Sequence, residues 1–213
     1  MTLKEMKCFY EKEKKVIKGR LKEFELVYAE NDRRILEELC FCIFTANASA
    51  KMGFTCIDLI RPVLLTASPE ELSRRIKGRY RFWRVRPKYL VHTREYLRSG
   101  YGLKMHNLIE SFGSDRDALR DFFAKGKDIK GIGYKEASHF LRNIGFKGYA
   151  ILDKHILNCL FEYGIIKKVE PMNTKQKYAE TEEKMKKFAK KIGIDFDELD
   201  LLFWSSKTGE VLK

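Results

Sequence analysis

The sequence predicts an all-α fold with two helical lobes, and three observations lead to that prediction. Apolar residues recur at helical spacing, alternating patterns typical of strands are scarce, and only four prolines occur. The hydrophobic fraction of 44% and the 15 phenylalanines allow a chain of 213 residues to bury a substantial core. We therefore expect roughly nine to eleven short helices.

Local patterns predict the individual helices. Ser68 marks a helix start, Asn173 and Asp195 are each followed three residues later by Gln or Glu, as in a capping box, and Gly145 marks a helix end. An unusually apolar run indicates a buried central helix. In chain order, the expected helices include residues 35–43, 69–76, 117–125, 137–144 and two late helices that open after Asn173 and Asp195.

Shifts in composition predict how these helices group. Residues 31–150 hold the most apolar helices and a helix-hairpin-helix at about 117–145, and they form the expected central lobe. Residues 1–30 and 151–213 carry Lys-rich amphipathic helices, which we expect to pack on each other as the second lobe.

The charge balance favours a polyanionic partner. The chain carries 43 Lys and Arg against 30 Asp and Glu, a net charge of +13. Clustered cations bind phosphate backbones by releasing counterions, so nucleic acid is the favoured partner class. The alternative is a Lys-rich surface with no such partner.

Cysteine usage and hydropathy indicate a cytoplasmic protein. The five cysteines are odd in number and form no CxxC pair, which argues against a disulfide framework and a cysteine metal site. No apolar run approaches the ~18 residues needed to span a bilayer, and the N-terminus is charged throughout.

The segment "IKGIGYKEA" contains the best candidate for phosphate binding. Gly131 and Gly133 allow the backbone to approach a ligand closely, and a helix that begins directly after them presents free N–H groups to an anion. In a basic, helical chain this pattern favours DNA phosphate binding. The alternative is an ordinary helix–helix turn that needs glycine only for its geometry.

The wider stretch "KGIGYKEASHFLRNIGFKGYAILDKH" resembles the helix-hairpin-helix of the DNA glycosylase superfamily. The family hairpin usually reads Leu-Pro-Gly-Val-Gly; this chain has Lys130 in place of the proline, and its following loop "GFKGYA" also contains no proline. In bifunctional members a catalytic lysine stands two positions after the second glycine, which implies Lys135. The characteristic aspartate of the family falls on Asp153.

The chemistry of these two residues fits that role. A lysine amine attacks only when it is neutral, and burial together with the positive charges of His139 and Arg142 would favour that form. The 18 positions between Lys135 and Asp153 allow a helix and a return, which could bring a carboxylate beside the amine. The alternatives are a phosphate contact for Lys135 and a helix N-cap for Asp153, which could serve both purposes.

Features of the whole chain indicate which branch of the DNA glycosylase superfamily it resembles. No cysteine follows Cys159, so the iron–sulfur cluster of the endonuclease-III-like branch is missing, and a buried helix near Arg34 leaves no room for an N-terminal β-sheet lobe. The chain resembles the compact 8-oxoguanine DNA glycosylase/AP lyase group of archaea and a few thermophilic bacteria. That resemblance covers nearly the whole chain, including "FTANASAKMG", "RYRFWRVRPKYL" and "DLLFWSSKTGEVLK".

The resemblance implies a DNA repair enzyme that excises 8-oxoguanine opposite cytosine from double-stranded DNA. The base is flipped out, Lys135 forms a Schiff base with the sugar, and β-elimination cuts the strand. We expect a monomer with no required cofactor and no metal, although a monovalent cation could bind the hairpin carbonyls. The alternatives are a glycosylase of the same fold for another damaged base, and a non-catalytic DNA-binding module.

Three further segments are expected to contact DNA. Asn47 would enter the gap left by the flipped base, and Phe82 or Trp83 would intercalate; each could instead be a structural residue. Trp204 would stack on the flipped base, which the terminal Lys213 would also contact. The expected contacts to the DNA backbone are Gly131, Gly133, Lys130, Arg84, Arg86 and Lys88, and His139 is expected to line the base pocket.

Overall fold

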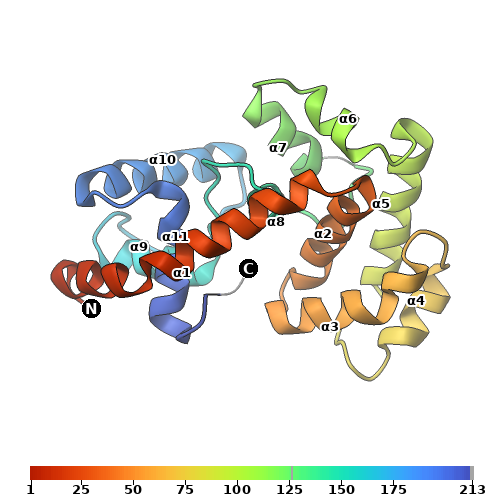
Figure 1. The fold of residues 1–213 in the computed structure, drawn as a ribbon, viewed down its shortest axis with the longest axis horizontal. Helices are drawn as coiled ribbons and strands as arrows, with labels where there is room; N and C mark the ends of the chain where they lie inside the picture. Colours follow the sequence, from red (N-terminus) through yellow and green to blue (C-terminus); the bar gives the residue numbers. More distant parts are fainter. Residues whose placement is uncertain (126, 212–213) are drawn as a thin grey trace. The chain divides into compact units, whose positions relative to one another are not determined.

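The computed structural model describes residues 1–125 and 127–211, and every regular element in this part of the chain is a helix (Figure 1). The all-α prediction is confirmed. The elements are α1 (Leu3–Ala29), α2 (Asp32–Thr45), α3 (Ala50–Ile60), the 3₁₀ helix η1 (Arg61–Val63), α4 (Pro69–Ile76), α5 (Arg86–Tyr101), α6 (Met105–Glu110), α7 (Arg116–Lys125), α8 (Tyr134–Asn143), α9 (Lys154–Glu162), α10 (Lys175–Ile192) and α11 (Phe196–Thr208).

The caps explain where several helices begin. The Ser68 side chain accepts the Glu71 N–H at the start of α4, and the Asp195 side chain accepts the Asp197 N–H at the start of α11, as expected. The predicted cap Asn173 was wrong by one position. Thr174 has the extended backbone of an N-cap and accepts the Lys177 N–H, so its hydroxyl takes that place.

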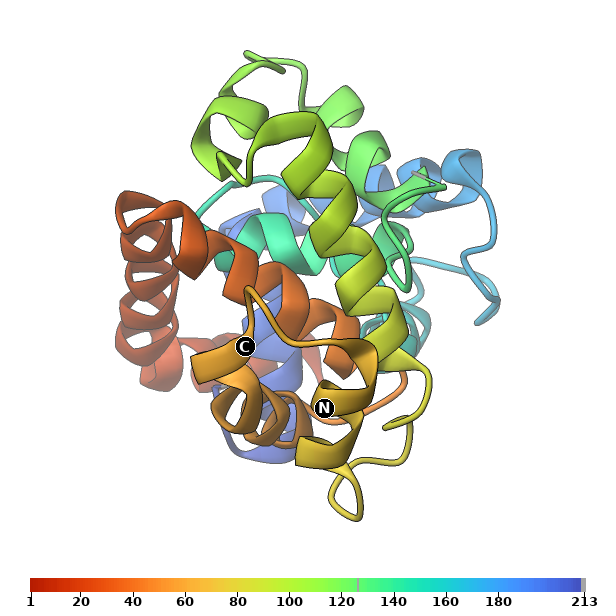
Figure 2. The ribbon, with the colours of Figure 1, turned by 90° about the vertical axis from the view of Figure 1, so that its right-hand side faces the viewer.

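The chain forms two compact units, one of residues Val27–Phe140 and one of Met1–Leu26 with Leu141–Lys213. In the first unit, α2 lies at the centre and packs against α3, α5 and α6; Figure 2 shows α5 passing alongside α2. All but the first three residues of α2 are buried, which explains its continuous apolar run.

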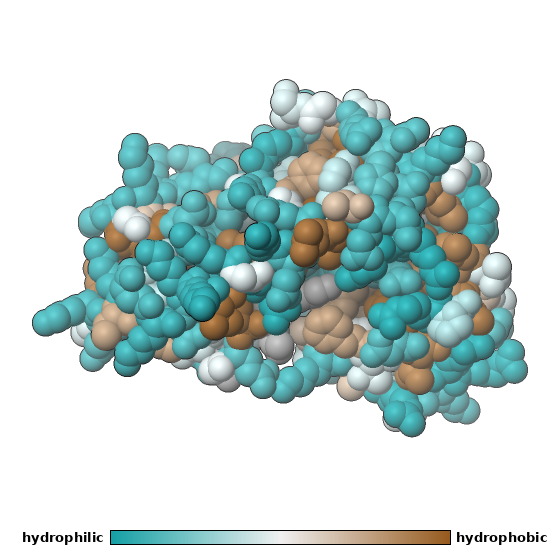
Figure 3. Space-filling model, in the orientation of Figure 1, coloured by the Kyte–Doolittle hydropathy of each residue, from teal (hydrophilic) through white to brown (hydrophobic). Residues whose placement is uncertain are grey.

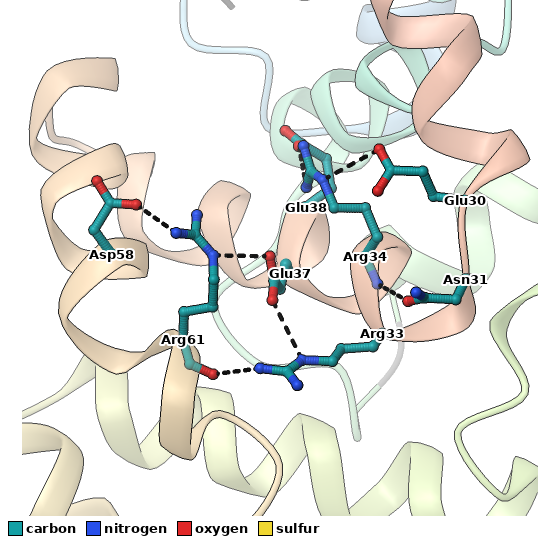
Figure 4. Close-up of polar contacts among 8 residues, drawn as sticks. All are labelled: Glu30, Asn31, Arg33, Arg34, Glu37, Glu38, Asp58 and Arg61. Carbon is teal, nitrogen blue, oxygen red and sulfur yellow. Dashed lines mark hydrogen bonds and ion pairs between the residues drawn. The ribbon is translucent and has the colours of Figure 1, made fainter.

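Two carboxylates on α2 are also buried, and arginines neutralise them (Figure 4). Glu37 accepts a hydrogen bond from Arg61 Nε at 3.2 Å and lies 3.5 Å from Arg33 Nε. Glu38 accepts from Arg34 Nη1 at 3.3 Å. A buried charge is tolerated only when it is paired. The Glu37–Arg61 contact joins α2 to the start of η1, directly after α3, whereas the other two contacts lie within α2.

The second unit is built from most of α1 with α9, α10 and α11. Its core contains Phe24, Tyr178 and Phe203, all nearly inaccessible to solvent. The Tyr10 hydroxyl donates to Glu198 at 2.6 Å and so joins α1 to α11. Burial, followed by this hydrogen bond, raises the pKa of Tyr10 well above its ordinary value.

The surface is mostly hydrophilic on the face shown in Figure 3, where apolar side chains appear in small separate groups. Among the described residues, no helix has both the length and the apolar character that crossing a bilayer requires.

Candidate active site

The hairpin joins α7 to α8 and contains two glycines with different structural roles. Gly131 has a φ of +78°, a left-handed conformation that favours glycine. Gly133 donates its N–H to Glu136 Oε2 at 3.2 Å, which satisfies one of the free amides at the start of α8. Lys130, between α7 and the first glycine, donates its N–H to the Thr93 hydroxyl at 2.9 Å.

Lys135 lies in the first turn of α8, directly after the hairpin. Its side chain is 28% exposed and its Nζ lies 3.1 Å from Glu136 Oε1. The Glu136 carboxylate therefore contacts both the hairpin backbone and the candidate nucleophile. Glu136 is not among the residues predicted from the sequence, although its three-residue spacing from Gly133 is that of a capping interaction and could have identified it.

The two basic residues further along α8 are both buried. His139 is 8% exposed, and its ring meets the Phe41 ring edge-on, with centroids 5.9 Å apart. Arg142 Nη1 lies 3.5 Å from Asp200 Oδ2, and both side chains are about 5% exposed. Burial raises the pKa of the Asp200 carboxyl, although the positive charge of Arg142 acts against this shift.

Asp153 is the N-cap of α9. Its backbone is extended, with φ −85° and ψ 178°, and its Oδ1 accepts the Ile156 N–H at 2.8 Å. The capping role expected for this residue is confirmed. Lys135 belongs to the unit of residues 27–140 and Asp153 to the other unit. Their joint action therefore stays a prediction.

Asn47 lies in the turn between α2 and α3. It is exposed and has a φ of +59°, a conformation that asparagine tolerates better than most residues. Arg81 Nη2 donates to the Asn47 carbonyl at 2.9 Å, so the loop before α5 helps to hold this turn.

The two candidate intercalating residues are half-buried and lie under cations. The Arg81 guanidinium lies 4.3 Å from the Phe82 ring centroid, and that of Arg84 lies 4.3 Å from the Trp83 centroid. Lys77 Nζ lies 5.4 Å from Trp83. Aromatic rings interleaved with cations suit a surface that stacks on bases and follows phosphates.

The expected contacts to the DNA backbone differ in exposure. Arg84 and Lys88 are exposed, whereas Arg86 is only 9% exposed. The Arg86 guanidinium points into the protein and donates to two backbone carbonyls, those of Ala46 and Gly131.

Trp204 lies on α11 and is half-buried against an exposed imidazole. The His155 and Trp204 ring centroids are 4.6 Å apart, with the planes tilted by 50°. His155 follows Asp153 by two residues, so the first turn of α9 carries both the capping carboxylate and the ring that contacts Trp204. His155 is not among the residues predicted from the sequence. Lys213 lies outside the described residues.

The cysteines offer no metal site. Cys8 is exposed and the other four are buried, and all five are free thiols. Within residues 1–125 and 127–211, no cluster of three or more His, Cys, Asp or Glu side chains has an arrangement that could hold a metal ion.

Comparison with known proteins decides the family. The 8-oxoguanine DNA glycosylase family model matches residues 17–194 of this chain. The chain belongs to the 8-oxoguanine DNA glycosylase family. A relative in this family, the 8-oxoguanine DNA glycosylase/AP lyase of Methanocaldococcus jannaschii, is 37% identical over 201 residues, which cover 94% of this chain and 93% of the relative. The enzyme of the same name from Aquifex aeolicus is 35% identical and covers 100% and 99% of the two chains.

Solved structures of 8-oxoguanine DNA glycosylases share the fold. The M. jannaschii glycosylase/lyase in complex with a 15mer DNA containing 8-oxoguanine matches with a TM-score of 0.89 and 36% identity, over 99% of each chain. The Thermotoga maritima 8-oxoguanine DNA glycosylase matches with a TM-score of 0.87 and 32% identity, over 99% of this chain and 98% of the other.

Proposed function

We propose that this chain is a bifunctional DNA repair enzyme, which excises 8-oxoguanine and then cleaves the DNA strand at the resulting site. The observation that carries the proposal is the position of Lys135 in the first turn after the glycine hairpin of a chain that belongs to the 8-oxoguanine DNA glycosylase family. An enzyme that does chemistry on a base cannot reach it inside the DNA duplex, so we expect the 8-oxoguanine nucleotide to be flipped out of the duplex.

The proposed reaction uses Lys135 as the nucleophile. Its Nζ bonds to C1′ as the bond from C1′ to the base breaks, and the base leaves with the electron pair. The nitrogen then loses a proton and the bond from C1′ to O4′ breaks, with O4′ taking up a proton, so the sugar ring opens and C1′ and Nζ form a protonated Schiff base. This Schiff base allows a proton to leave C2′ and the 3′ oxygen to depart with the electron pair of its bond to C3′, which is β-elimination. Asp153 stabilises the positive charge that develops on the sugar and assists proton transfer.

Glu136 contacts Lys135 directly. At 3.1 Å from Nζ, its carboxylate pairs with the ammonium form and is close enough to accept the proton that the amine must lose before it attacks. The hydrogen bond from Gly133 fixes that carboxylate in turn. Glu136 therefore links the Lys135 amine, which attacks the sugar, to the hairpin backbone at Gly133, which we expect to bind the neighbouring DNA phosphate.

The remaining roles concern recognition. Asn47 enters the gap left by the flipped base and contacts the opposite cytosine, while Phe82 or Trp83 intercalates. Trp204 stacks on the flipped base, His139 lines its pocket, and Lys213 contacts its edge. The DNA backbone is held by Gly131, Gly133, Lys130, Arg84 and Lys88.

We further propose a monomer that acts in the cytoplasm on chromosomal DNA and needs no redox cofactor. A monovalent cation bound to the hairpin carbonyls would add positive charge beside the phosphate. Removing Lys213 from the chain tests the tail: the proposed base contact predicts lower selectivity for 8-oxoguanine over guanine, and unchanged selectivity would refute it.

Borohydride trapping on a duplex with an 8-oxoguanine·cytosine pair tests the main proposal. Wild-type protein should form a covalent adduct, because borohydride reduces the Schiff base, and Lys135→Ala should form none. A wild type that binds the duplex without forming an adduct would favour the non-catalytic DNA-binding module. Adducts confined to duplexes with another damaged base would favour the alternative glycosylase.

A further inference from the structure

Arg86 is a buried arginine at a point where three segments expected to contact DNA come together. It is the first residue of α5, directly after the loop that carries Phe82. Its exposure of 9% sets it apart from Arg84 and Lys88 in the same loop region, which are exposed. Because an arginine is seldom buried without partners, its contacts indicate its role.

The guanidinium joins two of the segments by hydrogen bonds. Nη2 donates to the Ala46 carbonyl at 3.1 Å, and Nη1 donates to the Gly131 carbonyl at 3.3 Å. Ala46 directly precedes Asn47, and Gly131 is the left-handed residue of the hairpin. One planar group therefore links the Asn47 turn to the hairpin.

Aromatic rings hold the guanidinium in this place. Its carbon lies 5.6 Å from the Phe82 ring centroid and 5.5 Å from that of Tyr89. A Cβ at Gly131 would lie 2.6 Å from Arg86 Nη1 and 2.8 Å from the Tyr89 ring. Glycine at position 131 therefore permits the close approach of Arg86 as well as the left-handed turn.

A second contact from α5 to the hairpin lies two turns further along. Thr93 is 1% exposed, and its hydroxyl accepts the Lys130 N–H at 2.9 Å. Helix α5 thus holds two adjacent residues of the hairpin, one by its carbonyl and one by its amide. Since a helix is rigid over such a distance, the two contacts set the position of the hairpin.

We propose that Arg86 is a positioning residue, which holds the hairpin, the Asn47 turn and the Phe82 loop in register for binding damaged DNA. This role takes the place of the phosphate contact expected from the sequence, and it rests on the proposed function. The planar fork of arginine reaches two carbonyls at once, whereas the ammonium group of lysine is a compact point donor without that fork.

The test compares Arg86→Lys with a matched control, Arg94→Lys. Arg94 is another buried arginine on α5, 3% exposed, and it donates to the Leu64 carbonyl and to Glu95 Oε1, each at 2.8 Å; neither partner belongs to the hairpin. For each variant, three quantities are measured: the single-turnover rate of 8-oxoguanine excision, the salt dependence of affinity for an 8-oxoguanine duplex, and the midpoint of thermal unfolding.

We expect Arg86→Lys to lower the single-turnover rate roughly 10- to 100-fold, because a misplaced site loses rate steeply. Its salt dependence should match that of wild type, since no phosphate contact is lost. Arg94→Lys should change the unfolding midpoint by a similar amount and leave the rate within about threefold of wild type.

Three results would overturn the inference. A salt slope reduced by about one would make Arg86 a phosphate contact. A normal rate in Arg86→Lys, or equal rate losses in both variants, would leave no special role for it. These results differ from failure of the proposed function, in which wild type itself forms no borohydride adduct.

Thr93→Val provides a second variant if Arg86→Lys does not fold. It preserves shape and removes only the hydroxyl that accepts the Lys130 N–H. We expect a rate loss of roughly fivefold with an unchanged salt slope. A wild-type rate in this variant would contradict the proposal that contacts from α5 set the position of the hairpin at Lys130.

Discussion

Asp153 combines a structural and a proposed chemical role in a single carboxylate. Oδ1 accepts the Ile156 N–H and starts α9, while a carboxylate has further acceptor sites with which to stabilise a cation. The same first turn carries His155, whose ring contacts Trp204. A change at Asp153 can therefore lower activity either through the chemistry or through the helix, and these effects need to be separated.

The pair Asp153→Asn and Asp153→Ala separates them. Asparagine is an N-cap about as good as aspartate, so Asp153→Asn should unfold at nearly the wild-type temperature, whereas Asp153→Ala should lose about 1 kcal/mol of stability. Both should lower single-turnover excision roughly 100-fold or more, because both remove the charge. Thermal unfolding and rapid-quench kinetics measure the two effects. Full activity in Asp153→Asn would leave only the capping role.

Helix ends in this protein are held by close backbone approaches as well as by caps. Gly145 follows α8 with a φ of +88°, and a Cβ on it would lie 2.6 Å from Glu25 Cα and 3.1 Å from Glu25 N. The end of α8 thus packs against the backbone of α1 within one unit. Gly164, after α9, has a φ of +68° but no atom within 4 Å of such a Cβ.

These two glycines form a matched pair for measurement. Gly164→Ala should lose about 1–2 kcal/mol from left-handed strain alone. Gly145→Ala should lose about 1–3 kcal/mol more, because α1 and α8 would have to move apart. Denaturant unfolding of both variants gives the difference, and equal losses would contradict the packing argument.

Stability of the whole molecule should depend on the protonation of His106. Its Nδ1 lies 2.6 Å from Asp32 Oδ1 and its Nε2 lies 2.8 Å from the Tyr28 carbonyl, so the ring joins α6 to α1 and α2. Only the protonated imidazole can donate at both nitrogens. The hydrogen bond to the Tyr28 carbonyl, followed by the contacts with Asp32 and opposed by partial burial, raises the pKa of His106 above its ordinary value of 6.5.

The raised pKa of His106 determines how the free energy of unfolding changes with pH. A pKa that is higher in the folded state gives stability that is complete below the unfolded value of 6.5 and is lost as the pH rises through the folded pKa. The free energy of unfolding should therefore fall as the pH rises above 6.5, and His106→Asn should show a smaller fall. Urea unfolding across this range tests it; identical pH profiles would exclude His106 as the cause.

The fold class, several helix bounds and the glycine hairpin with its lysine could be predicted from the sequence, because helical periodicity, capping and turns depend on neighbours within a few residues. The net charge of +13, which suits a DNA substrate, also follows from the sequence alone. The burial of Arg86 is visible only in the folded chain, since its partners Ala46 and Gly131 lie 40 and 45 residues away. The contact between the His139 and Phe41 rings is likewise visible only there. Burial is a property of long-range contacts, and for this reason a run of cations that all look exposed in the sequence contained one that lies inside the protein and donates to two distant carbonyls.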